Sequence, residues 1–355
     1  MRLPDFIAKF LYGRFQKYET ELHELSYLFW ECTQRCNLHC RHCGSDCSAH
    51  TQQPDMPFED FLKALLSIKS LVHPKNVTII MTGGEPLTRP DLAKCGATLK
   101  QHGFGWGIVT NGLYYDNNTH AQLLSAGMGS LSLSLDGLEK NHNYLRNNIK
   151  SFENAVHALA LIVASKQLNY DIVTCVHHRN INELHELKQF LIQRGVKKWR
   201  LFTIAPIGRA KNNPEMQISR EDLQSLIDFL MVAREDKRIH TTFSCEAFLG
   251  NYDRKVRDTP FFCRAGINIA SILVDGSISA CPNINRGFAQ GNIYKDTLVE
   301  VWNKRYQMFR DKTWTKTGIC ARCKDYQFCK GGAMHLWDES KNGIAKCLYQ
   351  TLFHP

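Results

Sequence analysis

Short apolar runs alternate with longer amphipathic segments along most of this chain. Each short run is typical of a buried strand, and each longer segment has apolar residues three and four positions apart, as on one face of a helix. The expected strands are residues 27–33, 77–82, 105–110, 131–136, 170–176 and 198–204. The expected helices are residues 58–72, 91–102, 119–126, 152–166, 181–194 and 221–234.

This alternation predicts an α/β fold with parallel strands and right-handed crossover connections. Six strand–helix repeats are too few for an eight-stranded barrel, so we expect a partial (β/α)6 TIM-like barrel over residues 26–240. Cofactor sites in such barrels lie at the carboxyl ends of the strands. Residues 241–355 are expected to form a small, cysteine-rich iron–sulfur domain.

Residues 1–25 mix Phe6, Phe10 and Phe15 with basic side chains, which predicts an N-terminal amphipathic helix. No continuous apolar segment follows the basic start, so this is not a signal peptide. Two placements stay open: the helix docks on the barrel, or it lies on a membrane surface.

The composition of the chain limits the classes of function that we expect. Hydrophobic residues make up 43% of the 355 residues, and no apolar run is long enough to span a membrane. The net charge of +10 is spread along the chain without a basic cluster, which gives no support for specific nucleic-acid binding. Fourteen cysteines without an export signal indicate metal ligation in a reducing, cytoplasmic setting.

Three of these cysteines, Cys36, Cys40 and Cys43, lie within eight residues, a segment that we call the cysteine loop. Thiolates this close suit a soft metal or an iron–sulfur cluster. A four-iron cluster held by three cysteines keeps one iron open for another ligand. A structural zinc loop or buried free thiols are the alternatives. Cys47 is expected to be a bystander.

Polar and glycine residues follow the expected strands. The second strand ends in Gly83-Gly84-Glu85-Pro86, where paired glycines allow the backbone to approach a ligand closely. Asn111 ends the third strand, and Ser134 and Asp136 share one face of the fourth. Arg146 follows shortly after. Their alternative roles are structural: Ser134 satisfies backbone groups, and Arg146 is a surface charge.

The cysteine loop, with the aromatic His42 directly before Cys43, resembles the radical SAM superfamily, as does the Gly-Gly-Glu-Pro segment. The resemblance implies a [4Fe–4S] cluster on Cys36, Cys40 and Cys43, with S-adenosyl-L-methionine (SAM) on the open iron. It also implies cofactor contacts, with the carboxylate of Glu85 on the SAM ammonium group. The implied cofactor-binding residues are His42, Gly83, Gly84, Glu85, Pro86, Asn111, Ser134, Asp136 and Arg146.

A second cysteine group resembles the SPASM extension of radical SAM enzymes at six of its seven cysteine positions. The matching residues are Cys263, Cys281, Cys320, Cys323, Cys329 and Cys347. The pattern expects another cysteine at position 333, where this chain has alanine. The resemblance therefore implies one complete auxiliary [4Fe–4S] cluster on the last four cysteines. A second one on Cys263 and Cys281 is doubtful, although His335 is near in sequence. Thiolate-bound zinc is the alternative.

These features predict a radical SAM enzyme with an auxiliary cluster domain. The resemblance implies reductive cleavage of SAM to a 5′-deoxyadenosyl radical, which abstracts hydrogen from a peptide or protein substrate. An electron donor such as flavodoxin or ferredoxin is expected as a partner. The alternatives are a radical SAM enzyme of tetrapyrrole biosynthesis and a non-enzymatic iron–sulfur or zinc protein.

Overall fold

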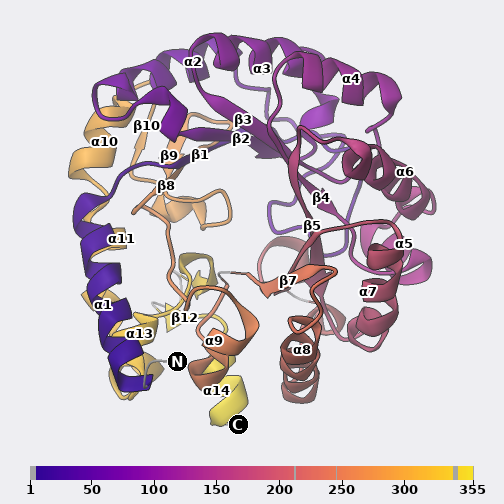
Figure 1. Cartoon of the computed structure of the whole chain (residues 1–355). Coiled ribbons are helices and arrows are strands. Elements are labelled where there is room, and N and C mark those ends of the chain that lie inside the picture. Colours follow the sequence, from indigo (N-terminus) through magenta and orange to yellow (C-terminus); the bar gives the residue numbers. More distant parts are fainter. Residues whose placement is uncertain (1–4, 212, 245, 339–342, 355) are drawn as a thin grey trace.

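The computed structural model describes residues 5–211, 213–244, 246–338 and 343–354. Its centre is one curved, ten-stranded sheet, with helices on its outer side (Figure 1). No helix in these ranges is long and apolar enough to cross a membrane.

Strands β1 to β7 lie next to one another in chain order and run parallel. Their bounds are β1 Tyr27–Thr33, β2 Thr78–Gly83, β3 Gly105–Thr110, β4 Ser130–Ser134, β5 Asn169–Val176, β6 Lys198–Thr203 and β7 His240–Phe243. The first six confirm the expected partial barrel. The sequence did not predict β7, which is short and adds a strand at the β6 edge. This strand spans the expected boundary at residue 240, and the division into domains stays a prediction.

Helices connect these strands on the outer face (Figure 1). Their bounds are α2 Phe58–Leu66, α3 Leu92–Gln101, α4 Asn117–Ser125, α5 Glu139–Arg146, α6 Ser151–Ala164, α7 Leu184–Gln193 and α8 Arg220–Ala233. Helix α8 begins at a capping box between Ser219 and Asp222, which satisfies backbone N–H groups of its first turn. Helix α5 was not predicted, because its sequence is almost entirely polar.

The core lies between the sheet and these helices. Trp30, Trp106 and Trp199 are completely buried there. A side chain at Gly96 of α3 would come within 2.2 Å of the Trp106 ring, so glycine allows α3 to pack closely on β3.

The C-terminal region continues the same sheet. Strand β8 (Ile269–Ile272) pairs in parallel with β1 and forms a hairpin with β9 (Ser277–Ser279), as the Asp275-Gly276 turn predicts. The remaining elements are short. They are α9 Asp253–Val256, β10 Gly291–Asn292, α10 Leu298–Lys304, α11 Gln307–Arg310, α12 Gly318–Ala321, α13 Tyr326–Cys329, β11 Trp337–Asp338, β12 Gly343–Ile344 and α14 Leu348–Phe353.

The N-terminal helix α1 (Asp5–Leu22) runs beside these C-terminal elements (Figure 1). The Tyr12 hydroxyl donates a hydrogen bond to the Pro260 carbonyl, and Gln16 donates to the Phe261 carbonyl at 3.2 Å. Glu19 pairs with Arg264 at 2.6 Å. These polar contacts are with the segment around Cys263, so the helix docks on the C-terminal region and not on the barrel, which was the first of the two expected placements.

Candidate functional site

The cysteine loop follows β1, so it lies at the carboxyl end of the barrel strands, where ligands bind in such folds. Burial raises the pKa of Cys36 to about 12, and nearby Glu85, Cys40 and Cys43 add to the increase. The structure therefore brings the three thiols together. In the absence of a metal the buried thiols of Cys36 and Cys40 favour their protonated form, which a bound metal would reverse.

The turn after β6 holds the cysteine loop in place. Arg209 Nε donates to the Cys40 carbonyl at 2.7 Å, and its backbone N–H donates to the Cys43 carbonyl at 3.0 Å. Gly208 has φ +54°, and a Cβ atom there would come within 2.3 Å of the Cys43 carbonyl oxygen. Glycine is therefore required for this close approach. The Pro-x-Gly-Arg-Ala segment was the sequence signal for this contact, which we did not predict.

Cys47 also contacts the cysteine loop. A hydrogen bond between the Cys43 and Cys47 thiols is the main reason why the pKa of Cys43 is lowered to about 5. Cys47 thus influences the cysteine loop in the protein without a metal, and the expectation that it is a bystander to metal binding stays a prediction. Its position four residues after Cys43 was the signal in the sequence.

The paired glycines at the end of β2 pack against the start of the cysteine loop. A Cβ atom at Gly83, which has φ +133°, would lie 2.1 Å from the Thr33 carbonyl oxygen. A Cβ atom at Gly84 would lie 2.1 Å from the Arg35 carbonyl oxygen. The Gly84 N–H donates to Thr33 and the Glu85 N–H to Arg35. These glycines are therefore needed to join β2 to the loop.

The side chain of Glu85 points into the protein and is 1% exposed. Its carboxylate accepts hydrogen bonds from the Thr110 hydroxyl and the Asn111 N–H, both at 2.8 Å, and from the Leu87 N–H at 3.2 Å. Burial raises the pKa of Glu85 to about 7, although the hydrogen bonds from these donors lower it in part. The Asn111 side chain in turn donates to Asn37 Oδ1 at 2.8 Å. Glu85 and Asn111 thus connect the ends of β2 and β3 to the cysteine loop, while the neighbouring Pro86 is buried.

Asp136 and Arg146 form a buried ion pair beyond the end of β4. The Arg146 Nε and Nη2 atoms lie 2.6 Å from Asp136 Oδ2, and its Nη1 atom lies 3.8 Å from Cys40 Sγ. Burial alone would raise the pKa of Asp136, but the Arg146 guanidinium, with smaller contributions from His42 and His142, holds this pKa below its ordinary value. Arg146 is therefore not a surface charge. Ser134, half-buried, ends β4 two residues earlier.

His42 lies beside this ion pair. One ligand atom from each of His42, Asp136 and Cys175 lies within 4.8 Å of the others. Burial lowers the pKa of His42 to about 3, with Arg146 as the next cause, so its imidazole is neutral. The Arg146 guanidinium already occupies the Asp136 carboxylate, and its charge disfavours a metal cation at this group.

Four cysteines come together in the C-terminal region: Cys320 on α12, Cys323 just after it, Cys329 on α13 and Cys347 directly before α14. Burial raises the pKa of Cys320 to about 11, and Cys347 and Cys323 add to the increase. Burial likewise raises the pKa of Cys329 to about 12, with contributions from Cys347 and Cys320. The complete four-cysteine set of the sequence pattern is thus assembled in space.

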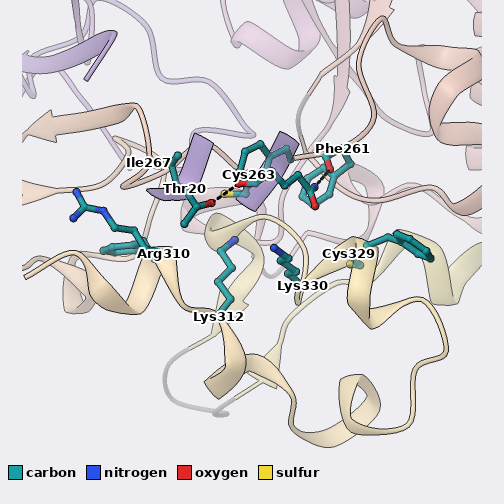
Figure 2. A pocket seen from close by; sticks show the side chains of 12 residues that line it. Thr20, Phe261, Cys263, Ile267, Arg310, Lys312, Cys329 and Lys330 are labelled. Carbon is teal, nitrogen blue, oxygen red and sulfur yellow. Dashed lines mark hydrogen bonds between the residues drawn. The ribbon is translucent and has the colours of Figure 1, made fainter. Parts of the chain in front are cut away.

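The surroundings of Cys263 and of position 333 differ from those of the four-cysteine set. Ala333 is 1% exposed and packs in the core. Cys263 lines a small cavity of about 20 Å³ together with Cys329 (Figure 2). His335, half-buried, lies instead on the wall of a larger cavity.

This larger cavity measures about 430 Å³ and lies between the barrel and the C-terminal region. Its barrel wall includes Cys43, Gly44 and the turn at residues 206–208. Its opposite wall includes residues 282–286, His335 and Trp337. A molecule in this cavity would therefore contact the cysteine loop and the C-terminal region at once.

Comparisons with known proteins agree with this arrangement. A family model described as the radical SAM superfamily matches residues 30–191, and a SPASM model, described as an iron–sulfur cluster-binding domain, matches residues 263–324. An AdoMet-dependent heme synthase of Nitratidesulfovibrio vulgaris is 24% identical over 343 residues, covering 90% of this chain and 91% of the relative.

The mycofactocin maturase MftC of Mycobacterium tuberculosis is 27% identical over 323 residues, covering 90% of this chain and 81% of MftC. The crystal structure of Streptococcus suis SuiB bound to S-adenosylmethionine shares the fold, with a TM-score of 0.70 at 17% identity. The match covers 95% of this chain and 81% of SuiB. The two family models, on a partial barrel that assembles the cysteine loop at its mouth, show that the chain belongs to the radical SAM superfamily and carries a C-terminal SPASM domain.

Proposed function

We propose that this radical SAM enzyme abstracts hydrogen from a peptide or protein that is being modified. The observation that carries the proposal is the 430 Å³ cavity, which has Cys43 and Gly44 on one wall and SPASM-domain residues on the other. A substrate held there lies beside the radical site. A non-enzymatic iron–sulfur or zinc protein would not need such a cavity.

The thiol groups of Cys36, Cys40 and Cys43 fit a [4Fe–4S] cluster with one open iron. Buried atoms beside them, Asn37 Nδ2 and His42 Nδ1, have no hydrogen-bond partner among the described residues and can serve a bound ligand. Bound cluster and SAM together supply one-electron cleavage of the sulfonium to methionine and a 5′-deoxyadenosyl radical. We propose a flavodoxin or ferredoxin as electron donor.

We assign the remaining cofactor-binding residues by their places around this loop. The backbone of Gly83 and Gly84 and the negative charge of Glu85 favour the ammonium group of SAM. Pro86 and Asn111 fix the same strand ends. Ser134, at the end of β4, and Asp136, just beyond it, flank the cofactor. His42 and Arg146 lie beside Asp136, and Arg146 also contacts Cys40.

The four-cysteine set, Cys320, Cys323, Cys329 and Cys347, fits one auxiliary [4Fe–4S] cluster whose irons all have a protein ligand. It would be structural or would carry electrons. Cys263 and Cys281 lack the further cysteine of the pattern, because position 333 is alanine.

The lining of the 430 Å³ cavity favours a peptide over a tetrapyrrole. Its volume lies in the lower part of the range of ligand pockets, roughly 300–1,000 Å³. Both acidic and basic residues line it, and Arg286 is already paired with Glu31 at 2.8 Å. Mixed charge and side-chain amides suit the donors and acceptors of a peptide, whereas a tetrapyrrole with several carboxylates needs several unpaired cations. MftC is named a maturase, and SuiB has also been solved with a precursor peptide bound.

Tetrapyrrole chemistry is the second candidate, because three AdoMet-dependent heme synthases match 85–92% of this chain at 22–25% identity. The test is to reconstitute the protein anaerobically, reduce it with dithionite and supply SAM with short peptides encoded beside its gene. We expect 5′-deoxyadenosine together with a changed peptide mass, and neither with the Cys36/Cys40/Cys43→Ala variant.

Iron-coproporphyrin III is the parallel probe. A visible-spectrum shift on binding and conversion of the porphyrin, with no change in any peptide, would replace the peptide proposal by the tetrapyrrole one. Undiminished 5′-deoxyadenosine formation by the triple alanine variant would overturn the assignment of the radical site itself.

A further inference from the structure

A buried lysine lies beside the position where the SPASM pattern expects another cysteine. Lys312 is 8% exposed, and its Nζ atom donates a hydrogen bond to the Gly332 carbonyl at 3.2 Å. Gly332 directly precedes Ala333, and its N–H donates to the Cys329 carbonyl at 3.1 Å. At position 333 this chain therefore has a methyl group where the pattern expects a thiol. The ammonium group of Lys312 contacts the preceding residue, Gly332.

Figure 2 shows the side chains of Lys312 and Lys330 pointing toward the same space, with Cys263 above them and Cys329 to one side. This space is the small cavity of about 20 Å³, which has room for about one water molecule. A [4Fe–4S] cluster is many times larger. The cavity between Cys263 and these lysines is therefore far smaller than a second cluster would need.

The charge around this small cavity is one-sided. Arg310, Lys312 and Lys330 line it, and no aspartate or glutamate is among its described lining residues. Arg310 Nη1 is also buried and has no hydrogen-bond partner within the described ranges. Buried cations are costly unless a negative group balances them.

The neighbouring four-cysteine set can provide that negative charge. A cluster held by four thiolates has a net negative charge, which increases by one when the cluster is reduced. Cys329 belongs to this set, and it lines the cavity together with both lysines.

We infer that Lys312, supported by Lys330, balances the negative charge of an auxiliary cluster on Cys320, Cys323, Cys329 and Cys347, and that this ammonium pair takes the place of a second auxiliary cluster. The inference rests on the proposed function, because it requires that cluster. Lys312 acts on the cluster through its charge and takes no part in the chemical step.

The inference has a redox consequence. A cation stabilises the more negative, reduced form of the cluster more than the oxidised form, so Lys312 raises the reduction potential. Because the ammonium group is buried, salt screens it little.

The test uses the full-length chain with Cys36, Cys40 and Cys43 replaced by alanine, so that only auxiliary iron is present. Iron and sulfide analysis should give one four-iron cluster per chain, and an EPR-monitored titration gives its potential. In this background Lys312→Met should shift the potential to a more negative value. Lys312→Arg, which keeps the charge, should stay close to the parent.

Lys316→Met is the matched control, because Lys316 is exposed in the same segment and should leave the potential unchanged. Equal potentials for Lys312→Met and the parent, or a shift to a more positive value, would overturn the inference. Two clusters per chain would show that the two lysines do not take the place of a second auxiliary cluster. No auxiliary iron at all would instead show that the proposed cluster is wrong, which separates the two failures. If Lys312→Met does not fold, Lys312→Gln provides the same neutral comparison, with circular dichroism as the check on folding.

Discussion

The carboxylate of Asp136 and the guanidinium of Arg146 meet at 2.6 Å inside the protein, and the same guanidinium extends to 3.8 Å from Cys40 Sγ. One residue on the last turn of α5 thus links the end of β4 to the cysteine loop. Asn147, in the left-handed conformation with φ +56°, ends the helix there and fixes the position of Arg146.

Replacing Arg146 by methionine should destabilise the apoprotein by about 3–5 kcal/mol, because it leaves the buried Asp136 charge without its partner. Adding Asp136→Asn should recover part of this loss, which a double-mutant cycle from urea denaturation measures. Arg200→Met is the control: its ion pair with Asp171 is partly exposed, so the cost should be only about 0–1 kcal/mol. Equal losses at both arginines would contradict the role of the buried pair.

Glu85 should make the stability of the apoprotein depend on pH. Burial raises its pKa from 4.5 to about 7, so between these values the folded protein retains a proton that the unfolded chain has lost. The contribution of Glu85 to stability is then largest below pH 4.5 and declines as the pH rises to 7, by at most about 1.4 kcal/mol per pH unit.

The measurement is the difference in unfolding free energy between the wild type and Glu85→Gln across this pH range. Subtracting the variant removes the titration of all other groups. A difference that decreases with rising pH is expected, and one that is constant or increases would exclude the raised pKa.

Gly208→Ala should loosen the cysteine loop and lower iron incorporation at the radical site. Its φ of +54° and the 2.3 Å approach of a Cβ atom to the Cys43 carbonyl oxygen leave no space for a methyl group. Auxiliary iron should be retained, because the four-cysteine set lies elsewhere. In the control Gly13→Ala, on α1, a Cβ atom meets nothing within 4 Å, so iron content should not change. Full incorporation in Gly208→Ala would show that this contact is not needed.

Much of the barrel could be predicted, because its strands and helices have strong and regular apolar periodicity. The expected bounds of β1 and β3 agree with the structure to the residue. Helix α5 and β7 were missed for opposite reasons: α5 is polar and held mainly by specific contacts, and β7 is only four residues long.

The cysteines and the glycine pair could be located from short-range spacing. The side chains that support them could not, because their partners are distant in sequence. Arg209 contacts Cys40 across 169 positions, and Gln16 contacts Phe261 across 245. The direction of the Glu85 side chain, toward Thr110 and Asn111, likewise depends on the neighbouring strand.

The pairing of β8 with β1 also bears on how this enzyme can be recombined. Four residues of β8, from Ile269 to Ile272, are hydrogen-bonded to the strand that leads into the cysteine loop. A chimera that exchanges the SPASM domain at residue 263 would therefore replace a strand of the central sheet, not an independent module. Donor domains should be compatible only when they supply a strand in the same register, and a chain truncated before β8 would expose an unpaired β1 edge prone to aggregation.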